Sequence, residues 1–250
     1  MSISITGISG IPAVQPGDDL AGLLLSALEH AKLRLLTGDV LVICQKVVSK
    51  AEGRIVRLTE VTASPFACKL AADMTDKDPR VIEVVLRETK RIVKMDRGHL
   101  ITEAGPGWVC ANAGVDESNS LGPDTVVLLP LDPDASARCL RQAVRQRAGA
   151  DVAVLITDTF GRPWREGLVD FALGVSGMDA LLDLRGQRDL TGRELHHTVM
   201  AQADALAAAA GLVMRKGDGI PAALVRGYQF TPVEGGGKRL IRAREFDLFR

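Results

Sequence analysis

The residues best suited to chemistry follow one apolar run. Thr157, Asp158 and Thr159 come directly after the apolar residues 152–156, so the pattern predicts a buried strand that carries a carboxylate and a hydroxyl at its carboxyl end. Ligand sites in α/β layers form at such strand ends. Arg162 and Arg165 follow, and cationic and anionic groups side by side are what a complex of a metal ion with a nucleotide requires. The segment predicts an enzyme that handles phosphate.

A second group of polar residues lies in the loop after Cys110. Asp116 and Asn119 follow Gly114 in this loop. The carboxylate can supply a hard oxygen ligand to Mg²⁺ or Mn²⁺, and the amide can bond a base, a ribose or a phosphate. The same spacing fits an Asx turn that closes the loop, just as Asp158 and Thr159 fit a turn or a helix cap. Taken alone, these residues do not distinguish a ligand site from a structural turn or cap.

A third group contains Lys46 and Lys50, four residues apart after the apolar run 40–44. Their Cα atoms would lie about 13 Å apart on a strand and about 6 Å apart on a helix. Only a helix would let both lysines grip one phosphate; a solvated lysine face is the alternative. No standard phosphate loop is present, because Gly235–Lys238 lacks the first glycine spacing and the hydroxyl. His196 and His197 are adjacent and cannot share one helix face as a metal pair would.

The elements that must position these groups can be read from the apolar periodicity. Helices and strands are mixed rather than strictly alternating, which favours an α+β fold with a mixed sheet and helices over a doubly wound parallel sheet. Helices are predicted at 20–30, 65–74, 79–90, 135–147 and 201–213, and strands at 1–6, 40–44, 100–101, 108–110, 126–129, 151–158 and 222–226.

Composition narrows the class of protein. The chain has 250 residues, of which 46% are hydrophobic, enough for a substantial core. Acidic and basic residues both number 31, so the net charge is +0, which argues against nucleic acid as a partner. The longest apolar run, 205–214, falls well short of the roughly 18 residues that suggest a membrane span. No secretion signal is visible, so we expect a cytoplasmic protein.

The cysteines do not suggest a metal site. Cys44, Cys68, Cys110 and Cys139 are far apart and show no Cys-x-x-Cys spacing. We therefore expect four small buried side chains in a reducing compartment.

Taken together, these clusters in this order resemble the coenzyme F420:L-glutamate ligase (F420-0 gamma-glutamyl ligase) family over nearly the whole chain. The motifs that carry the resemblance are Gly-Asp-Asp-Leu at 17–20, Gly-Asp-Val-Leu-Val at 38–42, Ser-Lys-Ala-Glu-Gly-Arg at 49–54, Cys-Ala-Asn-Ala-Gly-Val-Asp-x-x-Asn at 110–119, Leu-Asp-Pro-Asp at 131–134, Ile-Thr-Asp-Thr-x-Gly-Arg at 156–162, Gly-Arg-Glu-Leu at 192–195 and Gly-Ile-Pro at 219–221.

The resemblance implies a GTP-dependent ligase with an α+β fold, homodimeric, that uses Mg²⁺ or Mn²⁺ helped by K⁺. Its partners would be the F420 precursor, L-glutamate and GTP. In the family, GTP converts the acceptor carboxylate to an acyl phosphate, which the amine of L-glutamate attacks; later additions use the γ-carboxylate. Residues 1–250 would form a single ligase domain of one or two lobes, without the C-terminal reductase-like domain of some relatives.

Family roles carry over to named positions. Asp116, Asp158 and Lys50 are the expected catalytic residues, with Asp116 and Asp158 as ligands of one metal ion and Thr159 as a ligand of a second. The expected nucleotide-binding residues are Ile11, Pro12, Ala13, Val14, Gln45, Lys46, Lys50, Asn119, Met214, Arg215, Lys216, Gly217, Asp218, Gly219 and Ile220.

One departure from the family pattern bears on the second metal ion. The chain has Arg215-Lys216 where the family often has Gly followed by Glu or Gln. Because a protonated lysine cannot ligate a cation, Lys216 is expected to contact phosphate instead. Two alternative functions remain to be separated from the ligase: a metal-dependent nucleotide phosphohydrolase, and a non-catalytic nucleotide sensor.

Overall fold

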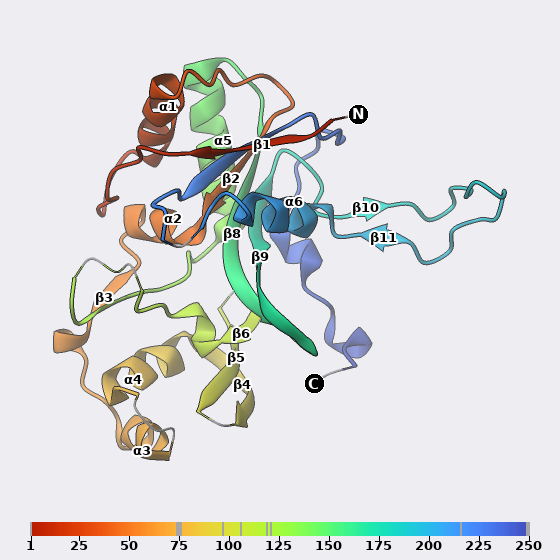
Figure 1. The fold of residues 1–250 in the computed structure, drawn as a ribbon. Coiled ribbons are helices and arrows are strands. Elements are labelled where there is room, and N and C mark those ends of the chain that lie inside the picture. The colour runs from red at the N-terminus through yellow and green to blue at the C-terminus, as the bar shows by residue number, and fades with distance from the viewer. Residues whose placement is uncertain are drawn as a thin grey trace.

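A five-stranded sheet forms the centre of the computed structural model, which describes residues 2–73, 77–96, 98–105, 107–118, 120, 122–215 and 217–248. The strand order is β1-β12-β2-β8-β9 (Figure 1). Neighbouring strands are antiparallel except for the parallel pair β2 and β8. The strands are β1 (Ser4–Ile8), β12 (Ala222–Arg226), β2 (Val40–Cys44), β8 (Ala153–Arg162) and β9 (Arg165–Ser176).

Helices cover both faces of this sheet because its central strands are apolar on both sides. In β2, Leu41 and Ile43 belong to one core cluster together with residues of α1 (Leu20–His30) and α5 (Pro133–Ala148). The alternate residues Val40 and Val42 belong to a second cluster with α6 (Gln202–Gly211). Successive side chains of a strand point to opposite faces, so the unbroken apolar run that predicted this strand gives a sheet between two helical layers.

A smaller group of elements lies beside one end of the sheet (Figure 1). It packs around its own apolar cluster, which includes Leu70, Ile82, Leu100 and Val126. Its elements are α3 (Pro65–Asp73), α4 (Pro79–Glu88), the three-stranded sheet of β4 (Thr89–Asp96), β5 (His99–Ala104) and β6 (Val109–Ala111), and the two-stranded sheet of β3 (Ile55–Arg57) and β7 (Thr125–Val127). The cluster also contains Leu173 of β9, so the two cores share a strand.

The remaining elements are short. Helix α2 (Gln45–Ala51) follows β2 directly, and a two-stranded arm of β10 (Leu182–Asp183) and β11 (Val199–Met200) extends away from the main body in Figure 1. Leu190 near the end of this arm is fully exposed. Short 3-10 helices lie at Leu58–Glu60, Asn112–Gly114, Gly237–Leu240 and Arg244–Phe246.

A buried carboxylate fixes the carboxyl-terminal segment to the sheet. Asp134, in the first turn of α5, is only 6% exposed. It accepts hydrogen bonds from the backbone N–H of Val175 on β9 at 2.9 Å and of Gly237 at 2.6 Å. Because these donors are buried and have no water to bond, one side chain joins a helix, a strand and the tail.

The α+β class is confirmed, as are the helices near 20–30, 65–74 and 135–147 and the strands at 40–44 and 222–226. The predicted helix 79–90 is too long. The chain becomes extended at Thr89, a β-branched residue that begins β4. The strand that was expected to end at Asp158 continues to Arg162 because it pairs with β9, an unpredicted strand. Among the described residues, none of the helices has the length and apolar character needed to span a bilayer.

Candidate functional site

Asp158 and Thr159 lie where β8 leaves the central sheet. The pairing of β2 with β8 ends at Cys44 and Thr157, and beyond this point β8 pairs with β9 alone. A register irregularity follows Ile156, and such irregularities bend strands and re-aim side chains. The Thr159 hydroxyl donates to Asp170 of β9 at 2.7 Å. The predicted carboxylate and hydroxyl thus lie at the end of the parallel pair, and the expectation that they end the strand itself was wrong.

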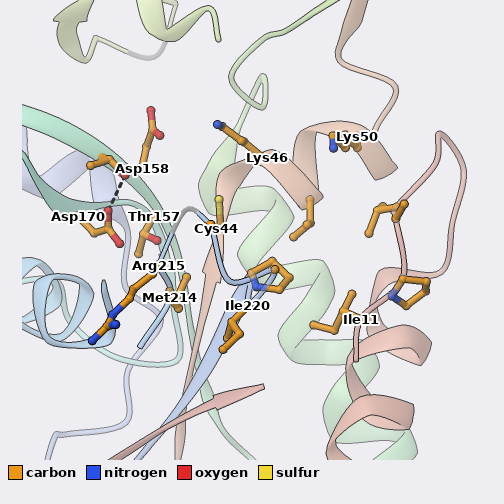
Figure 2. Close-up of a pocket in the computed structure, with 18 residues that line it drawn as sticks. Ile11, Cys44, Lys46, Lys50, Thr157, Asp158, Asp170, Met214, Arg215 and Ile220 are labelled. Atoms are coloured by element: carbon orange, nitrogen blue, oxygen red, sulfur yellow. Dashed lines mark hydrogen bonds between the residues drawn. The ribbon is translucent and has the colours of Figure 1, made fainter. Parts of the chain in front are cut away.

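The two lysines lie on α2, which begins at the end of the neighbouring strand β2. Segment 45–51 is helical. The shorter of the two distances considered from the sequence, about 6 Å between the Cα atoms of Lys46 and Lys50, therefore applies. Lys46 and Lys50 both line the cavity beside Asp158. In Figure 2, Lys46 extends from α2 toward the side on which Asp158 rises from β8. The parallel pair β2 and β8 therefore brings cations and a carboxylate to one edge of the sheet.

The cavity between these elements measures about 430 Å³, a volume typical of a small-molecule site. Apolar residues of the first loop form one wall and the loop after α6 forms another, with Arg215 pointing away from the lysines in Figure 2. Its lining comprises Ile11, Pro12, Ala13, Val14, Cys44, Lys46, Val47, Lys50, Thr157, Asp158, Thr159, Asp170, Met214, Arg215, Gly217, Gly219, Ile220 and Pro221.

The two lysines have different surroundings. Burial, and then repulsion from Lys46, lower the pKa of Lys50. Its charged form is therefore destabilised until an anion approaches. Lys46 is 9% exposed and forms an ion pair with Asp116, with 2.6 Å between Nζ and Oδ2. It also donates to the Ser118 hydroxyl at 2.7 Å.

Asp116 is held as an anion by these neighbours. Burial disfavours its charged form, but hydrogen bonds from Lys46 and from Ser118 outweigh burial and keep the pKa of Asp116 below its ordinary value. Its backbone exchanges two hydrogen bonds with Val127 of β7, both of 2.9 Å. The carboxylate is thus positioned by a strand edge and neutralised by a lysine.

The loop that leads to Asp116 has an unusual backbone. Asn112, Ala113 and Gly114 have φ angles of 52°, 53° and 72°. The left-handed region disfavours residues with a Cβ, by about 1–2 kcal/mol each, and such conformations cluster at ligand sites. Lys77 donates to the Asn112 side chain at 3.2 Å. The backbone of the loop that leads to Asp116 is therefore locally strained.

A second cavity, of about 530 Å³, shares Asp158 and Thr159 with the first. It lies along the β8–β9 hairpin and includes Asp116 and Arg162. Much of its wall is apolar, with Ile101, Val109, Val115, Phe160 and Leu168 among its lining residues. Two molecules could therefore bind on either side of Asp158 and meet there.

The donors at this junction fit a hard divalent cation. Carboxylates and a hydroxyl are ligands that Mg²⁺ and Mn²⁺ accept. In the part of the chain that the structure describes, no three Asp, Glu, His or Cys side chains are grouped to hold a metal ion. A cation would therefore take its other ligands from water and phosphate, as Mg²⁺ commonly does.

Most of the predicted site residues lie together, and a few do not. Gln45 is fully buried and accepts from Ser49 at 2.8 Å, and neither it nor Asp218 is among the described residues that line the cavity. Asn119 and Lys216 lie outside the described residues. Asp170 was missed, although its pairing with Thr159 would follow from a hairpin that turns at 163–164.

The cysteines give a first prediction. Two of them, Cys68 and Cys139, are exposed, so the expectation of four buried thiols was wrong: they lie on the outer faces of α3 and α5.

Burial raises the pKa of Cys44 to about 11 and that of Cys110 to about 12. Since the thiolate is the reactive form, iodoacetamide at mildly alkaline pH should label Cys68 and Cys139 first. Peptide mass spectrometry would measure this, and equally fast labelling of Cys44 would contradict it.

Comparisons with known proteins give a consistent result. A family model described as F420-0:Gamma-glutamyl ligase matches residues 9–227. The chain is 46% identical to the coenzyme F420:L-glutamate ligase of Methanothermobacter thermautotrophicus over 253 residues, which cover 100% of both chains. It is 52% identical to the protein of the same name from Methanopyrus kandleri, over 95% of this chain and 93% of the relative. The Archaeoglobus fulgidus protein of that name is 43% identical over 100% of this chain and 97% of its own.

Proposed function

Since the chain belongs to the F420-0:gamma-glutamyl ligase family and is a ligase, we propose that it joins L-glutamate to the deazaflavin precursor of coenzyme F420, with GTP as the phosphoryl donor. The observation that carries this proposal is the meeting of two cavities at Asp158 and Thr159. One cavity has the lysines that a triphosphate needs. The other has an apolar wall suited to a fused aromatic ring.

The reaction proceeds in two steps. A carboxylate oxygen of the precursor attacks the γ-phosphorus of GTP, the bond to the β-phosphate oxygen breaks, and GDP leaves. The α-amine of L-glutamate then attacks the acyl carbon, phosphate leaves with the C–O bonding pair, and the nitrogen loses a proton to give the amide. A carboxylate alone is a poor electrophile, and phosphorylation supplies its leaving group. Binding the reactants in line contributes most of the catalysis.

The described residues have separate tasks in this scheme. Lys46 and Lys50 bind phosphate oxygens, and Ile11, Ala13 and Ile220 contact the nucleoside. Asp116, Asp158 and Thr159 hold divalent cations, Mg²⁺ or Mn²⁺, which offset the charge of the triphosphate. Lys46 neutralises Asp116 when no cation is bound. Asp170 orients the Thr159 hydroxyl through their hydrogen bond.

Three further properties of the proposed enzyme come from the family resemblance. We propose that K⁺ assists the reaction, that the enzyme works in the cytoplasm, and that it is a homodimer. The projecting arm of β10 and β11, with its exposed Leu190, is compatible with contact between two subunits. Size-exclusion chromatography with light scattering would measure the oligomeric state.

The direct test is to incubate the protein with the F420 precursor, L-glutamate, GTP and Mg²⁺ or Mn²⁺. Mass spectrometry would follow the glutamylated product, and a coupled assay would follow GDP. We expect amide and GDP in equal amounts. GDP without amide would instead indicate a nucleotide phosphohydrolase, and nucleotide binding without GDP release would indicate a sensor.

Lys50 gives a prediction for the nucleotide side. We expect Lys50→Met to raise KM for GTP by about tenfold, since a hydrogen bond to a charged group contributes roughly 1.5–3 kcal/mol, while KM for L-glutamate stays unchanged. Steady-state kinetics with each substrate varied in turn would measure both constants. Lys69→Met, at an exposed position of α3, is the matched control. An unchanged KM for GTP would remove Lys50 from the nucleotide site.

A further inference from the structure

Arg162 occupies a particular position in the β8–β9 hairpin. It pairs with Arg165 at the turn, and the register between Gly161 and Arg162 is irregular, so that Glu166 and Gly167 bulge out of β9. Gly167 has a φ angle of +84°. One guanidinium nitrogen, Nη2, donates to the carbonyl of Glu166 at 2.9 Å. The bulge therefore holds the guanidinium in place against the hairpin.

A second guanidinium nitrogen of Arg162 lacks an acceptor in the described part of the chain. Its Nε is buried and has no hydrogen-bond partner among the described residues. A buried donor without an acceptor costs about 1–3 kcal/mol, so such a group calls for an explanation. Arg162 also lines the second cavity, where a bound molecule could supply the missing acceptor.

The charges around the second cavity indicate which chemical group could be the acceptor for the Arg162 Nε. Asp158 lines both cavities and Asp116 pairs with Lys46 of the first cavity. Arg162 is the one cationic side chain among the described residues that line the second cavity. A planar guanidinium pairs with a carboxylate through two parallel hydrogen bonds, one of which can come from Nε. One singly charged carboxylate matches one arginine.

We propose that Arg162 binds a non-reacting carboxylate of the amino acid substrate and thereby selects L-glutamate. This inference rests on the proposed function, which requires an amino acid to approach Asp158 from the side opposite the triphosphate. Arg162 lies four positions along the strand from Asp158, about 13 Å of backbone. The arginine side chain spans part of that distance and the glutamate the rest, with its amine toward the acyl phosphate and a carboxylate on Arg162.

The test is to compare Arg162→Met with wild-type enzyme. We expect KM for L-glutamate to rise at least about tenfold, because hydrogen bonds to charged groups contribute roughly 1.5–3 kcal/mol, while KM for GTP and for the precursor changes little. Arg162→Lys keeps the charge without the planar pair of donors and should recover part of the loss. Arg165→Met is the matched control, since Arg165 is exposed at the same turn and does not line the cavity.

Each outcome decides the assignment. An unchanged KM for L-glutamate, or a rise confined to the precursor, would overturn it. If Arg162→Met does not fold, Arg162→Lys carries the same comparison. If the wild-type protein forms no amide at all, the proposed function fails. Calorimetric titration of L-glutamate into wild-type and variant protein then tests the carboxylate site separately, and equal affinity in the two proteins would overturn it.

Discussion

Replacing Asp158 with asparagine is expected to lower the rate of amide formation by about 10³-fold, because metal-assisted charge stabilisation contributes several kcal/mol and each 1.36 kcal/mol is tenfold in rate. Asparagine keeps the shape of the side chain and removes its charge. Asp158 lies in both cavities, so the loss should appear in kcat rather than in KM for one substrate. Asp116→Ala, which removes the whole carboxyl group, should abolish turnover.

Circular dichroism and thermal unfolding would establish that the Asp158→Asn fold is intact, since the residue lies outside the fully buried part of β8. Glu166→Gln provides a control for charge removal on the same hairpin, at an exposed position. Quench-flow measurement of GDP would separate phosphoryl transfer from amide formation. Full activity in the Asp158 variant would rule out its role as a metal ligand.

Asp134→Ala is expected to lower the free energy of unfolding by about 3–6 kcal/mol, because two hydrogen bonds to a carboxylate contribute roughly 1.5–3 kcal/mol each. The substitution leaves the buried N–H groups of Val175 and Gly237 without an acceptor. A loss of this size should lower Tm by roughly 10 °C in a domain of this length. Denaturant titration at equilibrium would give the free energy directly.

Glu245→Ala is the matched control for Asp134→Ala, because Glu245 is exposed on the same carboxyl-terminal segment. Exposed substitutions usually change stability by no more than about 0.5 kcal/mol. Limited proteolysis should also cut the tail of the Asp134 variant sooner than that of the control. If the two variants unfold at the same denaturant concentration, Asp134 does not hold the tail to the sheet.

The sequence was most informative where a local pattern and the tertiary structure favour the same element. The run Val40–Cys44 is apolar at every position, and it forms a strand covered on both faces. Asp132 and Pro133 predicted the start of α5, and the Asp132 side chain accepts the N–H of Ala135 at 3.1 Å. The clusters around Lys46, Asp116 and Asp158 could be found because polar groups follow buried strands or enter glycine loops.

Asp170 shows why the rest of the site could not be found in the same way. Gly161 and Pro163 indicated a turn that ends the strand, whereas β8 continues to Arg162 and the chain reverses at Trp164, which has a φ angle of +58°. A tryptophan in that conformation is not a turn signal. Because the hairpin was not predicted, the register of its two strands was unknown, and Asp170 could not be paired with Thr159.

The β8–β9 hairpin sets the distance between Asp158 and Arg162, which both lie on β8. Adding one residue to each strand would lengthen it by about 3 Å and would also turn the arginine to the opposite face. Only paired insertions of two residues keep both groups on the same side, so the span can change only in increments of about 7 Å. If Arg162 binds the amino acid as proposed, its distance from Asp158 can change only in these steps, so a single inserted residue would not adapt the site to an amino acid one methylene longer.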